Sequence, residues 1–222
     1  INADFSQHAS LTFEQQQWVV SPQNGVERVM LDRIGEEKAR ATSLVRYAPD
    51  SYFPYHLHPG GEEILVLSGT FSADTADYPA GWYLRNPPNS GHQPHSDDGA
   101  IIFVKLRQMS DSDQQPVAIN TNDKSNWRSE SNREVCPLHA DANEKVCLQR
   151  LSANEALFSN TVSGGAEILV ISGELVEDGK VYDINSWIRL PADANSSLKA
   201  SNQGASIYLK THHLVSVIGT AI

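Results

Sequence analysis

The stretch that decides the fold is GGEEILVLSG at residues 60–69, because it returns as GGAEILVISG at residues 164–173. The two stretches lie 164 − 60 = 104 residues apart and agree at eight of ten positions. The same shift carries Arg85 to Arg189 and Pro87 to Pro191. A period of this length is that of a small domain rather than of a solenoid repeat, so the chain is predicted to hold two copies of one fold.

The predicted domains are residues 1–112 and residues 113–222. The polar stretch Ser110–Lys124 lies between the copies and is predicted to be a linker. Each copy has short β-branched and aromatic runs, which Gly, Pro, Asn and Asp interrupt at intervals of roughly ten residues. Neither copy has a convincing helical period. The pattern predicts an all-β protein of the jelly-roll kind.

The charge and hydropathy of the chain exclude several classes of partner. It has 17 Lys and Arg against 27 Asp and Glu, a formal net charge of −10, which argues against nucleic acid and anionic membrane surfaces. No apolar run reaches the ~18–20 residues of a membrane span. The sequence begins at Ile1 rather than Met, which leaves room for an upstream segment, and it shows no signal-peptide pattern. The default expectation is a cytoplasmic protein.

Two histidines in the first copy have the spacing of metal ligands. His56 and His58 precede the turn Pro59-Gly60-Gly61, and strand alternation places both imidazoles on one face, about 7 Å apart at the backbone. The turn can bring a carboxylate of the next strand beside them, and His92 follows further along the chain. Three imidazoles and one carboxylate suit Zn, Fe, Mn or Ni, with a position left for water or substrate.

Glu62 and Glu63 compete for the carboxylate position, and the second copy distinguishes them. Glu63 recurs as Glu167, whereas Glu62 becomes Ala166. The other three candidates are replaced as well: His56 by Asn160, His58 by Val162 and His92 by Ser196. Joint loss is expected of residues that share one ion. The predicted metal ligands are therefore His56, His58, Glu62 and His92, and residues 113–222 are predicted to be a degenerate copy that lacks them.

The remaining polar and aromatic candidates have plainer interpretations. His95, His8, His139, His212 and His213 are interpreted as surface or structural residues. Arg85 recurs as Arg189 in the copy without ligands, which favours a structural salt bridge. The two cysteines, Cys136 and Cys147, are interpreted as reduced thiols that pack as small hydrophobic residues. The aromatic residues that could line a cavity mouth are Tyr52, Phe53, Tyr55, Trp82 and Tyr83.

Two motifs of the first copy resemble those of the cupin superfamily. The first cupin motif, G-x5-H-x-H-x3-4-E-x6-G, is matched by His56, His58, Glu62 and Gly69, with Asp50 at its opening glycine. The second, G-x5-P-x-G-x2-H-x3-N, is matched by Gly81, Pro87 and His92, with Asn89 at the inner glycine and Ser96 at the closing Asn. The stretches RYAPDSYFPYHLHPGGEEILVLSG and DYPAGWYLRNPPNSGH are closer still to the cupin domain of the ChrR anti-sigma factor family.

This resemblance implies a bicupin, with two tandem cupin (double-stranded β-helix) domains. ChrR-like cupins are zinc-binding regulatory domains, so the implied function is a metal-binding regulatory or sensor module, with zinc preferred. Related cupins are non-haem dioxygenases, which makes a dioxygenase acting on a small ketone or diketone the alternative. A third interpretation is a structural bicupin whose metal site is vestigial.

The resemblance also bears on partners. A small-molecule ligand in the first cavity is expected, and cupins of this kind are frequently homodimers. The anti-sigma activity of ChrR resides in an N-terminal helical domain with a His-x3-Cys-x2-Cys zinc motif. This sequence does not contain that motif, so sigma-factor binding is not assigned to this chain by itself.

Overall fold

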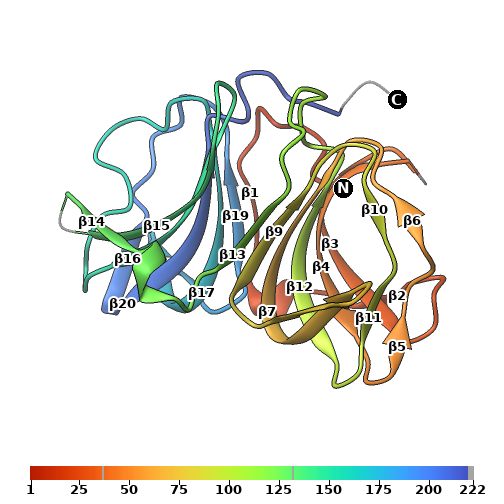
Figure 1. The fold of residues 1–222 in the computed structure, drawn as a ribbon. Helices are drawn as coiled ribbons and strands as arrows, with labels where there is room; N and C mark the ends of the chain where they lie inside the picture. Colours follow the sequence, from red (N-terminus) through yellow and green to blue (C-terminus); the bar gives the residue numbers. More distant parts are fainter. Residues whose placement is uncertain (37, 132, 220–222) are drawn as a thin grey trace. The chain divides into compact units, whose positions relative to one another are not determined.

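Two β-rich units make up the chain in the computed structural model, which describes residues 1–36, 38–131 and 133–219 (Figure 1). The first unit contains residues 1–3, 17–122 and 218–219, and the second contains residues 4–16 and 123–217. The predicted all-β fold is confirmed: in the described residues the helical elements are two short 3-10 turns, η1 (Phe13–Gln15) and η2 (Lys124–Asn126).

The strands of the first unit form one large antiparallel sheet system and a separate two-stranded pair. The large sheet has the order β13-β9-β7-β12-β4-β3-β2, with β5, β8 and β11 paired off this path, and β6 pairs with β10. The strands are β2 (Val19–Val20), β3 (Val26–Ile34), β4 (Arg40–Tyr47), β5 (Ser51–Tyr52), β6 (His56–Leu57), β7 (Glu62–Ala73), β8 (Ala76–Pro79), β9 (Trp82–Asn86), β10 (Gly91–His92), β11 (Pro94–Ser96), β12 (Ala100–Leu106) and β13 (Val117–Asn120).

The second unit repeats this order with equivalent strands. Its sheet runs β1-β19-β17-β20-β16-β15-β14, with β18 paired to β17. The strands are β1 (Ala9–Leu11), β14 (Arg128–Glu130), β15 (Arg133–Ala140), β16 (Lys145–Leu151), β17 (Ala166–Glu177), β18 (Lys180–Tyr182), β19 (Trp187–Leu190) and β20 (Lys199–Thr211). The central strand β7 thus corresponds to β17, as the repeated decapeptide predicts.

Two edge strands pair with the unit on the other side of the predicted boundary at residues 112/113. β13 falls within the predicted linker Ser110–Lys124, yet it pairs with β9 of the first unit, Val117 opposite Arg85 and Ile119 opposite Tyr83. β1 pairs with β19 of the second unit, Ala9 opposite Arg189. Each segment is too short to show a strand period among its polar neighbours, and each is ordered by backbone pairing with a long-range partner.

Alternation along the strands gives each unit an apolar interior. In the first unit the inward residues of β7 and β12 are Ile64, Val66, Ile102 and Val104, all buried in one apolar cluster. In the second unit the cluster extends over the positions equivalent to the candidate ligands, because Val162 and Ala166 are part of it. The described residues contain no helix long and apolar enough to cross a bilayer.

Three departures from the cupin motifs have a local explanation. Asp50 and Asn89, which stand where the motifs have glycine, adopt φ values of 56° and 66°. Asp and Asn tolerate this left-handed region better than other L-residues, so the turns are kept without glycine. Ser96 replaces the closing Asn and donates its hydroxyl to the carbonyl of Thr70 at 2.6 Å.

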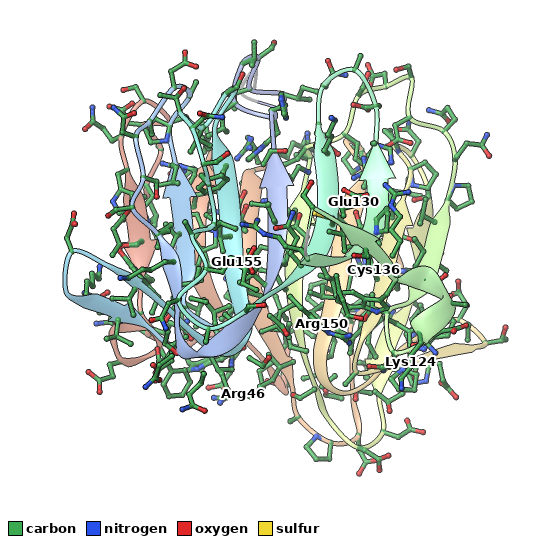
Figure 2. The ribbon with its side chains drawn as sticks, turned by 90° about the vertical axis from the view of Figure 1, so that its left-hand side faces the viewer. Arg46, Lys124, Glu130, Cys136, Arg150 and Glu155 are labelled. Atoms are coloured by element: carbon green, nitrogen blue, oxygen red, sulfur yellow. The ribbon has the colours of Figure 1, made fainter. Side chains whose placement is uncertain are left out.

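The two cysteines are free thiols, as interpreted from the sequence, and they give a direct test of the second unit. Cys136 lies on β15 near Arg150 (Figure 2), and burial raises the pKa of its thiol above the ordinary value. Burial also raises the pKa of Cys147 to about 11. Since the thiolate is the nucleophile, iodoacetamide at pH 8 is expected to alkylate Cys147 about a hundredfold more slowly in the native protein than in the urea-unfolded chain, and Cys136 is also expected to react more slowly in the native protein. Mass spectrometry measures both rates, and equal rates would contradict this packing.

Candidate metal centre

The four predicted ligands come together in the first unit. His56 on β6 lies opposite His92 on β10 in an antiparallel pair, His58 follows two residues after His56, and Glu62 opens β7. Their ligand atoms all lie within 4.8 Å of one another. His58, Glu62 and His92 are buried, and His56 is half-buried. The same-face spacing of His56 and His58 thus leads to one cluster, as the alternation predicts.

The turn between β6 and β7 brings Glu62 to the histidines. The carbonyl of His58 accepts hydrogen bonds from the N–H groups of Gly60, Gly61 and Asn89, at 2.9, 3.1 and 2.8 Å. Gly61 has a φ of +76°, and a Cβ added there would lie 2.4 Å from the Met109 sulfur. The reversal therefore depends on a glycine at this position.

Gly61→Ala is expected to lower the free energy of unfolding by about 2–4 kcal/mol, since left-handed strain of about 1–2 kcal/mol adds to the clash with Met109. Gly179→Ala is the matched control, because Gly179 has a φ of +81° with nothing within 4 Å of an added Cβ. The Gly179→Ala variant should lower the free energy of unfolding only by the backbone strain of about 1–2 kcal/mol. Urea unfolding of both variants measures the difference. Equal destabilisation would show that Met109 imposes no constraint on the turn.

Hydrogen bonds to the outer atoms of the ligands hold their orientation. His56 Nδ1 lies 3.0 Å from the Pro54 carbonyl oxygen, and His58 Nδ1 lies 3.1 Å from Ser90 Oγ. With Nδ1–H donating to the carbonyl, His56 keeps its lone pair on Nε2, and the same tautomer serves His58. Asn86 Nδ2 donates to Glu62 Oε2 at 2.9 Å. Such second contacts are typical of metal-binding histidines and carboxylates.

The inner atoms fit a cation. His58 Nε2 and His92 Nε2 lie 3.3 and 3.4 Å from the same oxygen, Oε2 of Glu62. Both nitrogens are buried without a hydrogen-bond partner. Buried polar atoms without partners are rare and costly, and a metal ion among these atoms would coordinate all of them. The residues present therefore fit a divalent ion.

Burial sets the charge state of the cluster. Desolvation, followed by the neighbouring imidazoles, lowers the pKa of His58 to about 3, and desolvation with His56 lowers the pKa of His92 to about 4. Desolvation raises the pKa of Glu62 to about 7, against the opposing effect of the Asn86 hydrogen bond. Both histidines are thus neutral at pH 7, the form in which imidazole coordinates a metal.

Glu63, the competing carboxylate, has a structural role. Its Oε2 lies 3.3 Å from Arg85 Nη1, and Arg85 Nη2 lies 2.6 Å from Asp113. Glu63 pairs in register with Arg85 and Lys105, and the same pairing recurs as Glu167 with Arg189 and Lys210. The recurring residues belong to the repeated scaffold.

The equivalent positions of the second unit have other roles. Val162 and Ala166 are buried in the apolar cluster, Asn160 is exposed, and Ser196 donates to Glu177 at 2.8 Å. His213 Nε2 lies 3.4 Å from Glu167, and His139 lies near Asp141. Within the described residues, the four-residue group of the first unit is the cluster of metal-ligand type.

A cavity of about 340 Å³ adjoins the cluster and is lined by His56, His58 and Glu62. Of the aromatic candidates, Phe53 lines it, with its ring 5.3 Å from that of His56, whereas Tyr52 and Tyr55 are exposed. Tyr83 is buried, and Trp82 packs against the apolar cluster.

The sequence patterns did not identify several other lining residues, among them Tyr47, Arg28 and Arg33. Burial and the charge of Glu62 both raise the pKa of Tyr47, so its phenol stays neutral. Strand alternation could have placed Tyr47 on the cavity face, but not both arginines, because the register of β3 shifts between Met30 and Asp32.

Comparisons with known proteins give a family match for residues 6–110 and a fold match for nearly the whole chain. The family model described as the ChrR cupin-like domain matches residues 6–110. No curated protein has a sequence that matches this chain. Among solved structures, a "putative dioxygenase" from Nostoc punctiforme is similar over 97% of this chain and 86% of its own length, with 13% identity and a TM-score of 0.74.

Two other solved structures have the same fold. A cupin 2 conserved barrel domain protein from Leptotrichia buccalis matches 95% of this chain and 98% of its own, at 15% identity and a TM-score of 0.62. The pirin YhhW from Escherichia coli, in complex with nickel(II), matches 92% of this chain and 98% of its own, at 9% identity and a TM-score of 0.70. The similarity of these structures over nearly the whole chain, together with the two repeated β-units, shows that the chain has the fold of two tandem cupin domains. The family match shows that residues 6–110, in the first repeat, are similar to the ChrR cupin-like domain.

Proposed function

We propose that the first unit is a regulatory or sensor module that binds one divalent metal ion through His56, His58, Glu62 and His92 and a small molecule in the adjoining cavity. The observation that carries this proposal is the convergence of two buried, unpartnered Nε2 atoms on one carboxylate oxygen. A bound divalent ion would supply Lewis acidity beside the cavity. Asn86 and Ser90 orient the side chains that hold it.

Zinc is the proposed metal, and iron, manganese and nickel are the alternatives. The similarity to ChrR-like cupins supports zinc, while the nickel complex of the pirin YhhW supports a wider range for this fold. Three imidazoles and a carboxylate are compatible with each of them.

The lining of the cavity supports binding rather than acid–base catalysis. Among its described residues, the histidines and the carboxylate are all members of the metal cluster. The remaining titratable groups there are Tyr47, whose phenol stays neutral, and arginine and lysine side chains. A general base independent of the cluster is therefore lacking in the described part of this cavity.

A non-haem dioxygenase acting on a small ketone or diketone is the second candidate. It is supported by the fold similarity to the dioxygenase-like protein of Nostoc punctiforme and by a cavity that reaches three of the four cluster residues. Such an enzyme needs no general base, because redox-active iron would supply the oxygen chemistry.

Metal analysis followed by oxygen uptake distinguishes the two functions. The protein is purified without added metal, its metals are measured by elemental analysis, and iron(II)-loaded protein is then mixed with acetylacetone in an oxygen electrode. We expect about one zinc per chain and no diketone-dependent uptake. Stoichiometric iron with uptake that depends on the diketone would contradict the sensor proposal and favour the enzyme.

A further inference from the structure

The cavity beside the metal cluster is positively charged, although the chain carries a net charge of −10. Its lining includes Arg28, Arg33, Lys38 and Arg107. Glu62 is the single carboxylate among the described lining residues, and it belongs to the metal cluster. The remaining walls are largely apolar, with Val26, Val45, Phe53 and Ile102 among them. This combination of cations and apolar walls is suited to an organic anion.

A β-bulge places two of the arginines on the cavity face. Residues 28 and 33 of a regular strand would point to opposite faces, since they differ by an odd number. The register between β3 and β4 shifts between Met30 and Asp32, so Arg28 lies opposite Val45 and Arg33 opposite Ala41. Val45 and Ala41 both line the cavity. The bulge therefore reverses the alternation and directs both guanidinium groups to one side.

The two arginines differ from others of the first unit in their partners. Arg40, Arg46 and Arg85 each pair with a carboxylate, of Asp32, Glu27 and Glu63 respectively. Arg28 and Arg33, in contrast, have no ion pair with a carboxylate among the described residues: Arg28 Nε is buried without a hydrogen-bond partner, as is Arg85 Nε, and Arg33 donates to the backbone carbonyl of Glu36. Burial and the charge of Arg28 lower the pKa of Arg33, against the influence of Glu36. An anion between the two would satisfy the buried donor and offset their repulsion.

The second unit lacks both arginines at the equivalent positions. Val45 and Ala41 correspond to Gln149 (45 + 104) and Lys145 (41 + 104), whose partners in register are Val135 and Ala140. Arg28 and Arg33 are therefore replaced in the same copy that lacks the four metal ligands. Arg85, which holds the scaffold together, recurs as Arg189. The two arginines are thus absent from the second copy, like the candidate metal ligands, whereas the scaffold residue Arg85 is retained.

We propose that the cavity of the first unit binds a small organic carboxylate through Arg28 and Arg33. The proposal rests on the proposed function in taking this cavity as the ligand site of the metal module, but the arginine contacts themselves need no metal. Each charge-assisted hydrogen bond to a carboxylate contributes enough that its loss weakens binding about tenfold or more.

Calorimetric titration with matched probes tests the proposal. The probes are the dicarboxylates from malonate to adipate and their uncharged diamides, titrated into zinc-loaded protein. We expect at least one dicarboxylate to bind about tenfold or more tightly than its diamide. Arg28→Gln and Arg33→Gln should each weaken that dicarboxylate by about tenfold. Arg46→Gln is the matched control, because Arg46 lies on the neighbouring strand, pairs with Glu27 and is absent from the cavity lining; it should bind within about twofold of wild type.

Metal content and melting temperature are measured for every variant, so that a loss of carboxylate binding can be distinguished from a loss of metal or of folding. Binding that does not distinguish dicarboxylates from diamides, or that Arg28→Gln and Arg33→Gln leave at the level of Arg46→Gln, overturns the carboxylate site. Arginine-dependent carboxylate binding to a protein that takes up no metal supports this site and overturns the proposed metal function. Normal metal content with no preference for carboxylates supports the proposed metal function and overturns the carboxylate site.

Discussion

Replacing His58 with alanine is expected to weaken zinc binding at least a hundredfold and to leave the purified protein with almost no metal. His58 is buried, its Nε2 has no hydrogen-bond partner, and it lies 3.3 Å from Glu62. Removing one of four ligands leaves a site with too few donors for tight coordination. Elemental analysis gives the metal content, and competition with a chromophoric chelator gives the affinity.

Ser196→Ala is the control for this prediction, because Ser196 occupies the position equivalent to His92 in the second unit. It donates to Glu177 there, so the variant should keep wild-type metal content. Equal metal content in wild type and His58→Ala would refute the ligand assignment. A loss of metal in Ser196→Ala would contradict the assignment of the metal site to the first unit alone.

Replacing Arg85 with methionine is expected to lower the free energy of unfolding by about 3–5 kcal/mol, because it removes the buried cation that contacts both Glu63 and Asp113. The Arg85 side chain is 1% exposed and lies within 3.3 Å of both Glu63 and Asp113. The two acids would then face each other's charge in a site with little water. Urea unfolding monitored by tryptophan fluorescence measures the loss.

Arg46→Met is the matched comparison. Arg46 pairs with Glu27, but its side chain is 41% exposed, so solvent screens the pair and the change should cost less than about 1 kcal/mol. The metal content of Arg85→Met, measured under folding conditions, should stay close to that of wild type, since Glu63 and Arg85 are not ligands. Destabilisation of the same size in both variants would show that the buried Arg85 pairs contribute no more to stability than the exposed Arg46–Glu27 pair.

The candidate metal cluster could be predicted from the sequence because each step rests on a local rule. Strand alternation places His56 and His58 on one face, and the glycine turn returns the chain to Glu62. The second copy separates Glu62 from Glu63, which the structure pairs with Arg85. The long-range step, from His56 to His92, rests on the joint replacement of the four residues in the second copy and on the resemblance to the cupin motifs, and the β6–β10 pairing supplies its physical basis.

The features that the sequence could not reveal depend on register and on distant partners. Arg28 and Arg33 share a face only because a bulge interrupts β3, and no residue of Val26–Ile34 marks that bulge unambiguously. The strands Val117–Asn120 and Ala9–Leu11 are short edges whose pairing is decided by β9 and β19. Such edges carry little periodicity of their own, so neither the repeat nor the polar stretch between the copies reveals them.

The three imidazoles and the carboxylate of the first unit are proposed to hold a divalent ion, and X-ray absorption at the K edge of the metal bound to the purified protein reports on these neighbours. We expect a sphere of nitrogen and oxygen neighbours at about 2.0–2.2 Å, with the outer-shell scattering of about three imidazole rings. His58→Ala loaded with excess metal should lose one ring from that pattern. A spectrum with sulfur neighbours at about 2.3 Å, or one without imidazole scattering, would contradict it.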